Sequence, residues 1–368
     1  MLPKKINKLS KEKTVLVVPL DWGLGHATRC IPLIKELQLC GCTVIIAAEN
    51  NVRTLLEREF QQLTFITVPG YRVSYSRSRH WLPLKIFLQI PKIIYRVYKE
   101  HSWLKKVAKR HDLDGIVSDN RFGLFHSSIP CIYITHQLLI KTGSAFTESL
   151  AQKLHYKFIK KYTACWVPDF AGKENMAGEL SHPHRLPGNV SYIGGLSRFD
   201  PLQSPAQKQL LLIILSGPEP QRSVFEDIIL KNLKNYKDPA ILIRGLPGAT
   251  SSRSLNLPKN IVVEDHLPAV ELNKVIVQAN YVIARSGYTT VMDLLKLGRK
   301  AILVPTPGQT EQEYLAEYLM GKKVFFSVKQ EHFHLEKALE RVRSFPFAST
   351  SFDMDLYKQF IHQFVELL

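Results

Sequence analysis

The sequence predicts an α/β protein of two domains, each built on a parallel β-sheet with helices on both faces. Short apolar segments alternate with longer helical ones along the chain, which is typical of parallel sheets. A length of 368 residues fits two such domains better than one. Pro201 and Pro205 mark a linker between two similar halves, so we place the domains at 1–200 and 205–345.

Seven short apolar segments predict the strands of the first half. They are Thr14–Leu20, Thr43–Ala48, Leu63–Val68, Gly115–Ser118, Cys131–Thr135, Ala164–Val167 and Val190–Gly195. Helices are expected at His26–Leu39, which a glycine closes, and at Asn51–Phe60. The basic stretch from Tyr71 to His111 predicts two helices, broken at Pro83 and Pro91.

The second half repeats this pattern. Its expected strands are Leu210–Ser216, Ala240–Arg244, Ile261–Val263, Tyr281–Ala284, Ala301–Val304 and Val324–Ser327. Helices are expected at Pro220–Leu233 and Tyr288–Leu297. The last segment, Met354–Leu368, has apolar residues at helical spacing and predicts a final helix within 350–368.

Composition argues for a cytoplasmic protein. The chain is 45% hydrophobic, which is enough for two cores, yet it has no run of about 18 uncharged apolar residues that would predict a membrane span. Thr14–Leu20 is too short for the apolar part of a signal peptide. The five cysteines match no metal-binding spacing, and their odd number suits a reducing compartment.

The net charge of +17 is concentrated in one stretch. Between Tyr71 and His111 there are eleven Lys or Arg residues, one acid and several aromatic residues, which suits an anionic membrane surface. The cations expected to face the membrane are Lys85, Lys92, Arg96 and Lys99. A solvated helical face is the alternative. No nucleic-acid recognition motif accompanies the charge, so nucleic acid is not an expected partner.

The segment 284–316 has the pattern of a nucleotide site. It predicts a strand, a glycine turn, a helix, a second strand and a polar loop that opens another helix. The residues expected around a phosphate at the helix start are Ser286, Gly287, Tyr288, Thr289 and Thr290. Asp293 lies one turn further on and can accept hydrogen bonds from a ribose. The alternative is an ordinary capped helix.

Three residues in the first half could act as a general base. Gly25 and His26 lie between the first strand and its helix, and Thr28 stands where an NAD fingerprint needs a third glycine, so NAD is disfavoured. Asp119 and His136 each follow a strand and should face the same crevice. The sequence does not rank His26, Asp119 and His136, and helix capping is the alternative role of Asp119.

The segment 284–316 resembles the donor-binding signature of GT-B glycosyltransferases. It is most similar to the family 28-like group that contains the peptidoglycan lipid-intermediate N-acetylglucosaminyltransferase and plant galactolipid synthases. The resemblance implies the GT-B fold, with two Rossmann-like domains facing across a cleft and a final helix that crosses back to the first domain. It also implies that the turn at Ser286–Gly287 holds the diphosphate of a UDP-sugar.

The resemblance assigns further donor contacts. Asp293 stands where the peptidoglycan enzyme has a ribose-binding Glu, and Gly25–His26 ends the first glycine loop of the group. Gln312 and Glu313 stand where the group has a Gln-Gln pair that touches the sugar, and Glu313 departs from that pattern. Beside this pair, Gln309 lies in the same loop. The remaining donor contacts implied are Arg198 and Ser216–Gly217 for the diphosphate and His266–Leu267 for the base.

We therefore expect a glycosyltransferase that moves a sugar from a UDP-linked donor to a hydroxyl of a lipid-linked or envelope glycan acceptor. The resemblance implies an inverting reaction that needs no metal and no cofactor, and the basic-aromatic stretch suggests that it takes place at the inner face of the membrane. Asp112-Leu113-Asp114 imitates a metal-binding motif, but we interpret it as a solvated loop. The alternatives are a nucleotide-sugar epimerase of the same fold and a non-enzymatic basic protein that binds membrane or nucleic acid.

Overall fold

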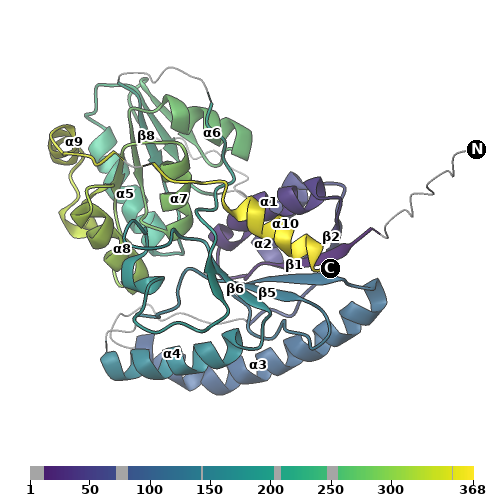
Figure 1. Cartoon of the computed structure of the whole chain (residues 1–368). Helices are drawn as coiled ribbons and strands as arrows, with labels where there is room; N and C mark the ends of the chain where they lie inside the picture. Colours follow the sequence, from purple (N-terminus) through teal and green to yellow (C-terminus); the bar gives the residue numbers. More distant parts are fainter. Residues whose placement is uncertain (1–11, 72–81, 142–143, 203–208, 247–255, 350) are drawn as a thin grey trace, which may run out of the picture.

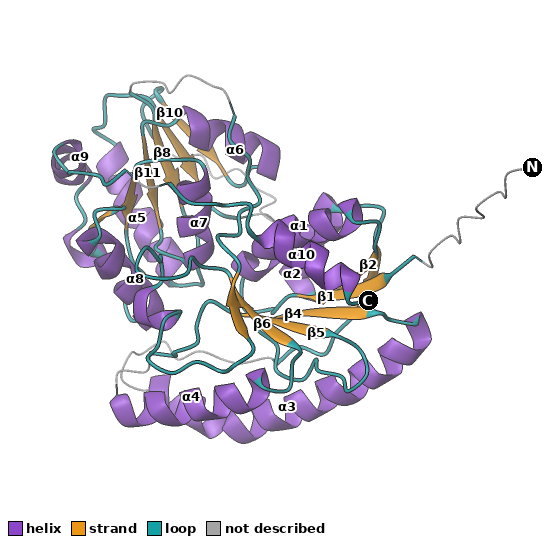
Figure 2. Ribbon diagram, viewed as in Figure 1, coloured by secondary structure: helices purple, strands orange, loops and turns teal. Residues whose placement is uncertain are grey.

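The computed structural model describes residues 12–71, 82–141, 144–202, 209–246, 256–349 and 351–368, with side chains left out at 82–91 and 145. It consists of two halves, each with its own β-sheet and surrounding helices (Figures 1 and 2). Every strand pairing is parallel, so the predicted fold class is confirmed. The predicted domain boundaries remain predictions.

The first sheet has seven strands in the order β3-β2-β1-β4-β5-β6-β7. Their bounds are β1 Thr14–Val18, β2 Thr43–Ala47, β3 Thr64–Ile66, β4 Gly115–Asp119, β5 Cys131–Ile134, β6 Ala164–Val167 and β7 Val190–Tyr192. Strands β1, β2 and β3 follow one another toward one edge of the sheet, and β4 to β7 follow one another toward the other edge, so the direction of the connections reverses between β1 and β4. In parallel sheets, ligands bind beyond the carboxyl ends of the strands at such a point.

Helices cover both faces of this sheet. They are α1 (Leu24–Leu39), α2 (Asn50–Glu59), α3 (Leu82–His111) and α4 (Ala145–Ile159), with a short 3₁₀ turn at Gly178–Leu180. Val15 and Val17 of β1 pack in the core that contains α1 and α2, whereas Leu16 and Val18 pack in the core that contains α3. This alternation follows from the two-residue period of a strand buried on both faces.

The second sheet has six strands in the order β10-β9-β8-β11-β12-β13. Their bounds are β8 Leu211–Ile214, β9 Ala240–Ile243, β10 Ile261–Glu264, β11 Tyr281–Ala284, β12 Ala301–Leu303 and β13 Phe326–Ser327. Its helices are α5 (Gln221–Leu233), α6 (Ala269–Gln278), α7 (Tyr288–Lys296), α8 (Thr310–Gly321) and α9 (Leu335–Arg343), with a 3₁₀ turn at Gln330–His332. α6 and α7 share one core with Val282, and α5 and α9 share the other with Ile283.

The last helix, α10 (Tyr357–Glu366), packs on the first half of the chain (Figure 1). Ile361 and Phe364 are buried in the same core as the apolar face of α1. The Phe364 ring meets the Trp166 ring edge-on, with centroids 5.9 Å apart. Residues of β1 and α1, near the start of the described sequence, and of α10, near its end, thus share one hydrophobic core.

The prediction of two helices in the basic stretch was wrong, because α3 is a single helix of 30 residues. Pro83 lies in its first turn, where a proline removes no helical hydrogen bond. Pro91 removes one such bond inside the helix, but Leu104, Val107 and Ala108 anchor the following turns in the core. None of the helices in the described part of the chain combines the length and apolar content that a bilayer crossing requires.

Candidate active site

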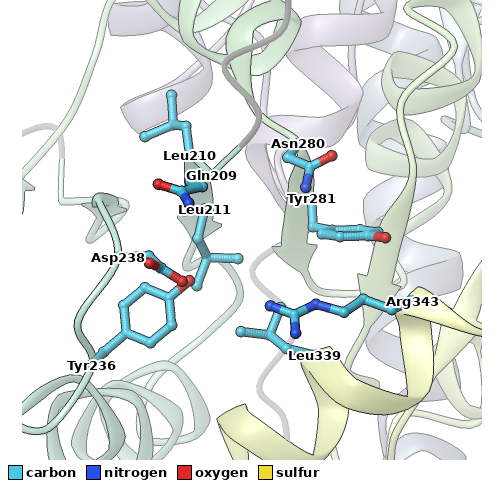
Figure 3. Close-up of a pocket in the computed structure, with 9 residues that line it drawn as sticks. All are labelled: Gln209, Leu210, Leu211, Tyr236, Asp238, Asn280, Tyr281, Leu339 and Arg343. Atoms are coloured by element: carbon cyan, nitrogen blue, oxygen red, sulfur yellow. The ribbon is translucent and has the colours of Figure 1, made fainter.

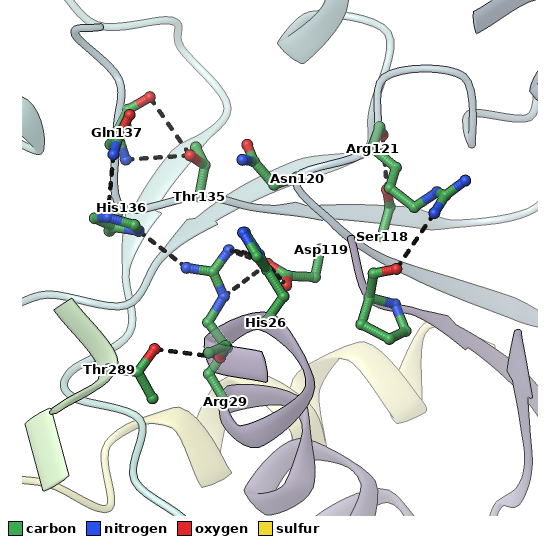
Figure 4. A network of polar contacts seen from close by, with 12 residues as sticks. His26, Arg29, Ser118, Asp119, Asn120, Arg121, Thr135, His136, Gln137 and Thr289 are labelled. Carbon is green, nitrogen blue, oxygen red and sulfur yellow. Dashed lines mark hydrogen bonds and ion pairs between the residues drawn. The ribbon is translucent and has the colours of Figure 1, made fainter. Parts of the chain in front are cut away.

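Two helix N-termini from different halves of the chain meet at this site. α1 begins after the loop that follows β1, and α7 begins after β11 and Gly287. Thr289 Oγ1 donates a hydrogen bond to the carbonyl oxygen of Gly25 at 3.2 Å (Figure 4). A Cβ atom at position 25 would lie 3.0 Å from that hydroxyl oxygen, so glycine permits the close approach. Helix N-termini attract anions, so the junction suits a diphosphate.

His26, in the first turn of α1, is fixed by a buried carboxylate. Its Nδ1 lies 2.8 Å from Oδ2 of Asp119, the last residue of β4, and Arg29 Nε donates to Oδ1 of Asp119 at 2.8 Å (Figure 4). Arg29 Nη2 also lies 2.9 Å from His26 Nδ1. Because the carboxylate accepts and cannot donate, we assign the Nδ1 proton to His26. The contact of Arg29 Nη2 with Nδ1 is then not a hydrogen bond, and Arg29 Nη2 donates to Asp119 Oδ1 instead. That tautomer leaves Nε2 as an acceptor, with no hydrogen-bond partner among the described residues.

The buried ion pair sets the protonation states at neutral pH. Burial lowers the pKa of His26 below its usual value, although Asp119 opposes this shift. Burial alone would raise the pKa of Asp119, but Arg29 and His26 bring it below its usual value. His26 is therefore an uncharged imidazole and Asp119 a carboxylate. These are the states that a general base and its orienting partner require.

His136, which follows β5, contacts both halves of the chain. Its Nδ1 accepts a hydrogen bond from Arg29 Nη1 at 2.9 Å, and its Nε2 donates to Glu311 Oε1 at 2.8 Å. Its ring stacks on the Tyr288 ring, with centroids 4.2 Å apart. Both ring nitrogens of His136 and both oxygens of Asp119 are thus occupied. Of the three predicted bases, His26 is the one that retains an available nitrogen in the described structure.

Asp293 of α7 faces the segment that links the two halves. Its Oδ1 accepts a hydrogen bond from Ser197 Oγ at 2.6 Å, and burial raises the pKa of Asp293 to about 6 although Arg198 opposes the shift. Burial also lowers the pKa of Arg198, and its buried Nε has no hydrogen-bond partner in the described ranges. Burial and the charge of Arg198 lower the pKa of His266. Arg198 therefore lies within electrostatic range of both Asp293 and His266.

The loop predicted to touch the sugar is held by its own hydrogen bonds. Gln312 Oε1 accepts from the Thr306 N–H at 2.9 Å, and Gln312 Nε2 donates to Gln309 Oε1 at 2.5 Å. Glu313 Oε1 accepts from a loop N–H at 2.9 Å. Ser286 Oγ donates to the Gln312 carbonyl oxygen at 2.8 Å. These side chains shape the loop, and their contact with a sugar stays a prediction.

The other predicted donor residues lie at the carboxyl edge of the second sheet. Ser216 and Gly217 follow β8, and Leu267 follows β10, while Thr290 lies in the first turn of α7. Gly217 has a φ of 101°, a left-handed conformation that favours glycine. The strand ends thus bring these residues to the edge where α7 begins.

The predicted membrane residues lie on α3. Lys92 and Lys99 are exposed and Arg96 is half-buried. Lys99 Nζ lies over the Tyr95 ring, 4.8 Å from its centroid. The side chain of Lys85 lies outside the described residues. A cationic surface on α3 is therefore present from residue 92 onward.

A shallow pocket lies at the opposite edge of the second sheet (Figure 3). Its lining includes Leu211 and Tyr281, which begin β8 and β11, together with Asp238 and Arg343. The helix N-termini lie at the carboxyl ends of the same strands. This pocket is therefore separate from the candidate active site.

One group of side chains in the described part of the chain could share a metal ion. Glu36, Cys40 and His362 place one ligand atom each within 4.8 Å of one another, and they join α1 to α10. Glu36 lies ten residues after His26 on α1, which is about 15 Å along a helix. The group is therefore remote from His26. The expectation that sugar transfer needs no metal stays untested.

Sequence reasoning missed two residues of the polar network. Arg29 binds Asp119 and His136, and its spacing of three residues from His26 was a signal that both share one helix face. Glu311 binds His136, and it also accepts from Gln137 Nε2. The position of Glu311 in the first turn of α8 gave no comparable signal, because its partners belong to the other half.

Comparison with known proteins identifies similar glycosyltransferases. Residues 264–356, which include α7 and the whole loop that follows β12, match the model of the glycosyltransferase family 28 C-terminal domain. An uncharacterised glycosyltransferase of Methanosarcina acetivorans is 24% identical, and the match covers 79% of each chain. A second one, from Methanosarcina mazei, is 23% identical with the same coverage.

Solved glycosyltransferases share the fold. The glycosyltransferase of kitacinnamycin superposes with a TM-score of 0.62 at 15% identity, over 97% of this chain and 95% of that one. SnogD from Streptomyces nogalater gives 0.60 at 15% identity over 97% and 95%. MurG of Acinetobacter baumannii gives 0.52 at 15% identity over 96% and 95%.

The fold and the matched relatives define a glycosyltransferase of the GT-B class. Within that class, residues 264–356 match the C-terminal domain of glycosyltransferase family 28.

Proposed function

We propose that this protein transfers a sugar from a UDP-sugar to a hydroxyl of a lipid-linked or envelope glycan acceptor, with inversion at the anomeric carbon and without a metal ion. The observation that carries the proposal is the meeting of two helix N-termini beside a free imidazole nitrogen. Thr289 joins α7 to Gly25, and His26 follows Gly25 directly. This junction therefore supplies both a binding site for the anionic leaving group and a base for the acceptor hydroxyl.

Each residue has a defined part in this reaction. The acceptor hydroxyl gives its proton to His26 Nε2 while its oxygen attacks the anomeric carbon, and the bond to the UDP oxygen breaks. Asp119 holds the imidazole through Nδ1 and stabilises the positive charge that forms. The N–H groups that begin α7, together with the Arg198 guanidinium, stabilise the departing diphosphate. Asp293 accepts hydrogen bonds from the ribose hydroxyls.

Ligand-dependent stabilisation against heat tests the donor. We expect UDP to raise the melting temperature more than GDP or dTDP. Asp293→Ala should weaken UDP binding by about 1.5–3 kcal/mol, the usual scale for hydrogen bonds to a charged group. Isothermal titration calorimetry with UDP measures this loss.

The matched control is Asp227→Ala, which removes an exposed carboxylate from α5. It should leave UDP affinity unchanged. Equal UDP affinity for wild type and Asp293→Ala would remove Asp293 from the donor site. Absence of binding to all three nucleotides would refute a nucleotide-sugar donor.

We also propose that the enzyme works at the inner, anionic face of a membrane, where it meets its acceptor. Lys92 and Lys99 of α3 are exposed beside Tyr95 and Tyr98, which are 56% and 70% exposed. Val97 of α3 and Phe158 of α4 contribute to the same small core, so both helices border it.

α4 carries an exposed apolar stripe of its own. Phe146, Leu150 and Leu154 are 78%, 55% and 40% exposed, and their spacing of four residues places them on one helix face. Lys153 and Lys157 are exposed beside them. Exposed apolar side chains among lysines suit insertion at the level of anionic headgroups.

Replacing Lys85, Lys92, Arg96 and Lys99 with Glu should abolish co-sedimentation with anionic vesicles and leave UDP affinity intact. Each cation near an anionic leaflet contributes about 1 kcal/mol, and salt should weaken the wild-type binding because exposed charges are screened. Sedimentation with phosphatidylserine-containing vesicles measures the effect.

A control with the same change of net charge is available on the second half. Lys231, Lys234, Lys237 and Lys274 are exposed there, and their replacement with Glu should preserve docking. Equal sedimentation of wild type with neutral and anionic vesicles would contradict the electrostatic part. No sedimentation with either would favour an acceptor that is not bound to a membrane.

A further inference from the structure

Two carboxylates converge at the carboxyl edge of the first sheet. Asp21 follows β1, Glu49 follows β2 and Gly70 follows β3, and these strands are neighbours in the sheet. A Cβ atom at position 70 would lie 2.5 Å from Asp21 Oδ2 and 2.9 Å from Glu49 Oε2. Both side chains therefore approach one point above the Gly70 backbone, and a side chain at position 70 would displace their carboxylate groups.

Asp21 is buried but has an unsatisfied oxygen. Its side chain is 9% exposed, and Oδ1 has no hydrogen-bond partner in the described part of the chain. The cation that pairs with it, Arg121 Nη1, is 4.0 Å away, which is beyond hydrogen-bond distance. Arg121 donates instead to Glu100 at 2.5 Å and to the Pro69 carbonyl oxygen at 2.6 Å. A buried acceptor of this kind is costly unless a ligand supplies a donor.

Trp22, the residue after Asp21, provides an exposed aromatic surface. Its side chain is 41% exposed, and its ring meets the Tyr71 ring edge-on at 6.3 Å between centroids. Tyr71 is itself fixed, because its hydroxyl donates to Glu100 at 2.7 Å. An exposed indole next to hydrogen-bond acceptors suits a ligand with an apolar face and a rim of hydroxyl groups.

We propose that Asp21, Trp22 and Glu49 form the acceptor subsite and that the acceptor presents a neutral or amino-substituted sugar ring to it. This inference rests on the proposed transfer function. The hydroxyl or ammonium groups of such a ring donate to Asp21 and Glu49, while its C–H face packs on Trp22. Two carboxylates would repel a phosphate or carboxylate at this end of the acceptor. Asp21 and Trp22 belong to the segment between β1 and α1, and the proposed base His26 follows Trp22 by four residues.

Saturation-transfer NMR in the presence of UDP tests the subsite with methyl α-glucoside, glucosamine and glucuronic acid as probes. We expect the first two to bind wild type with millimolar dissociation constants and glucuronic acid to give no signal. Asp21→Asn and Trp22→Leu should each weaken sugar binding by about tenfold, the effect of one hydrogen bond or packed ring. UDP affinity should not change.

Glu57→Gln is the matched control, because Glu57 is an exposed α2 carboxylate that pairs with Arg53. Equal sugar signals from wild type and Asp21→Asn would overturn the subsite, as would UDP binding by wild type without any sugar signal. If wild type binds no nucleotide at all, the proposed function fails first. Gly70→Ala fills the space between the carboxylates, and unchanged sugar binding by that variant would also overturn the subsite.

Discussion

Replacing His26 with alanine should slow sugar transfer by about 10²–10⁴-fold, the usual contribution of a general base. UDP binding should persist, because the N-terminus of α7 and Asp293 remain intact. The acidic limb of the pH–rate profile should be lost as well. Burial lowers the pKa of His26, so wild-type kcat/KM should rise with pH and level off below the pH at which an ordinary histidine deprotonates.

His332→Ala is the control for this substitution, because His332 is exposed on a 3₁₀ turn of the second half. It should leave both the rate and the pH profile unchanged. A His26→Ala enzyme with nearly wild-type turnover, or with the acidic limb intact, would show that another group takes the acceptor proton.

Asp119→Asn should destabilise the protein by about 3–5 kcal/mol and abolish most activity. The substitution leaves the buried Arg29 guanidinium without its counter-charge, and breaking a buried pair on one side carries a cost of that size. Because the pKa of Asp119 is lower in the folded state, its stabilising contribution is complete above about pH 4 and is lost as the pH falls further. Urea unfolding at several pH values measures the effect.

A double variant separates stability from catalysis. Asp119→Asn combined with Arg29→Met removes both charges, so most of the lost stability should return while activity stays low. Glu57→Gln breaks an exposed pair and should cost less than about 1 kcal/mol. Wild-type stability of Asp119→Asn, or recovery of activity in the double variant, would contradict the role assigned to the carboxylate.

Buried parallel strands were the most predictable part of the fold. Ala164–Val167 and Tyr281–Ala284 have the predicted bounds, because a strand covered on both faces must be an unbroken apolar run. α4 was not predicted. In this helix Phe146 and Leu150 are exposed to solvent. The spacing of its apolar residues therefore does not identify the helix face that packs on the core. Pro91 misled the prediction for α3, since packing of the later turns is invisible in the local sequence.

The candidate site was predictable where local pattern sets position. Strand ends bring Asp119 and His136 to the edge where α1 begins and where His26 lies in its first turn, and that follows from the order of strands. The preference for His26 over His136 could not be predicted. It depends on Glu311 and Arg29 occupying both nitrogens of His136, and Glu311 arrives from the other half only when the two halves meet.

The position of α10 has a consequence for biosynthesis. Its residues Ile361 and Phe364 complete the core beneath α1, and a Cβ atom at Gly115 of β4 would lie 2.8 Å from the Phe364 ring. Domains usually fold in order as they leave the ribosome. Here the half that is synthesised first must keep part of its apolar surface open until the whole second half has been translated. Chaperones that shield nascent chains should therefore engage the α1 surface, and release from them should coincide with docking of α10.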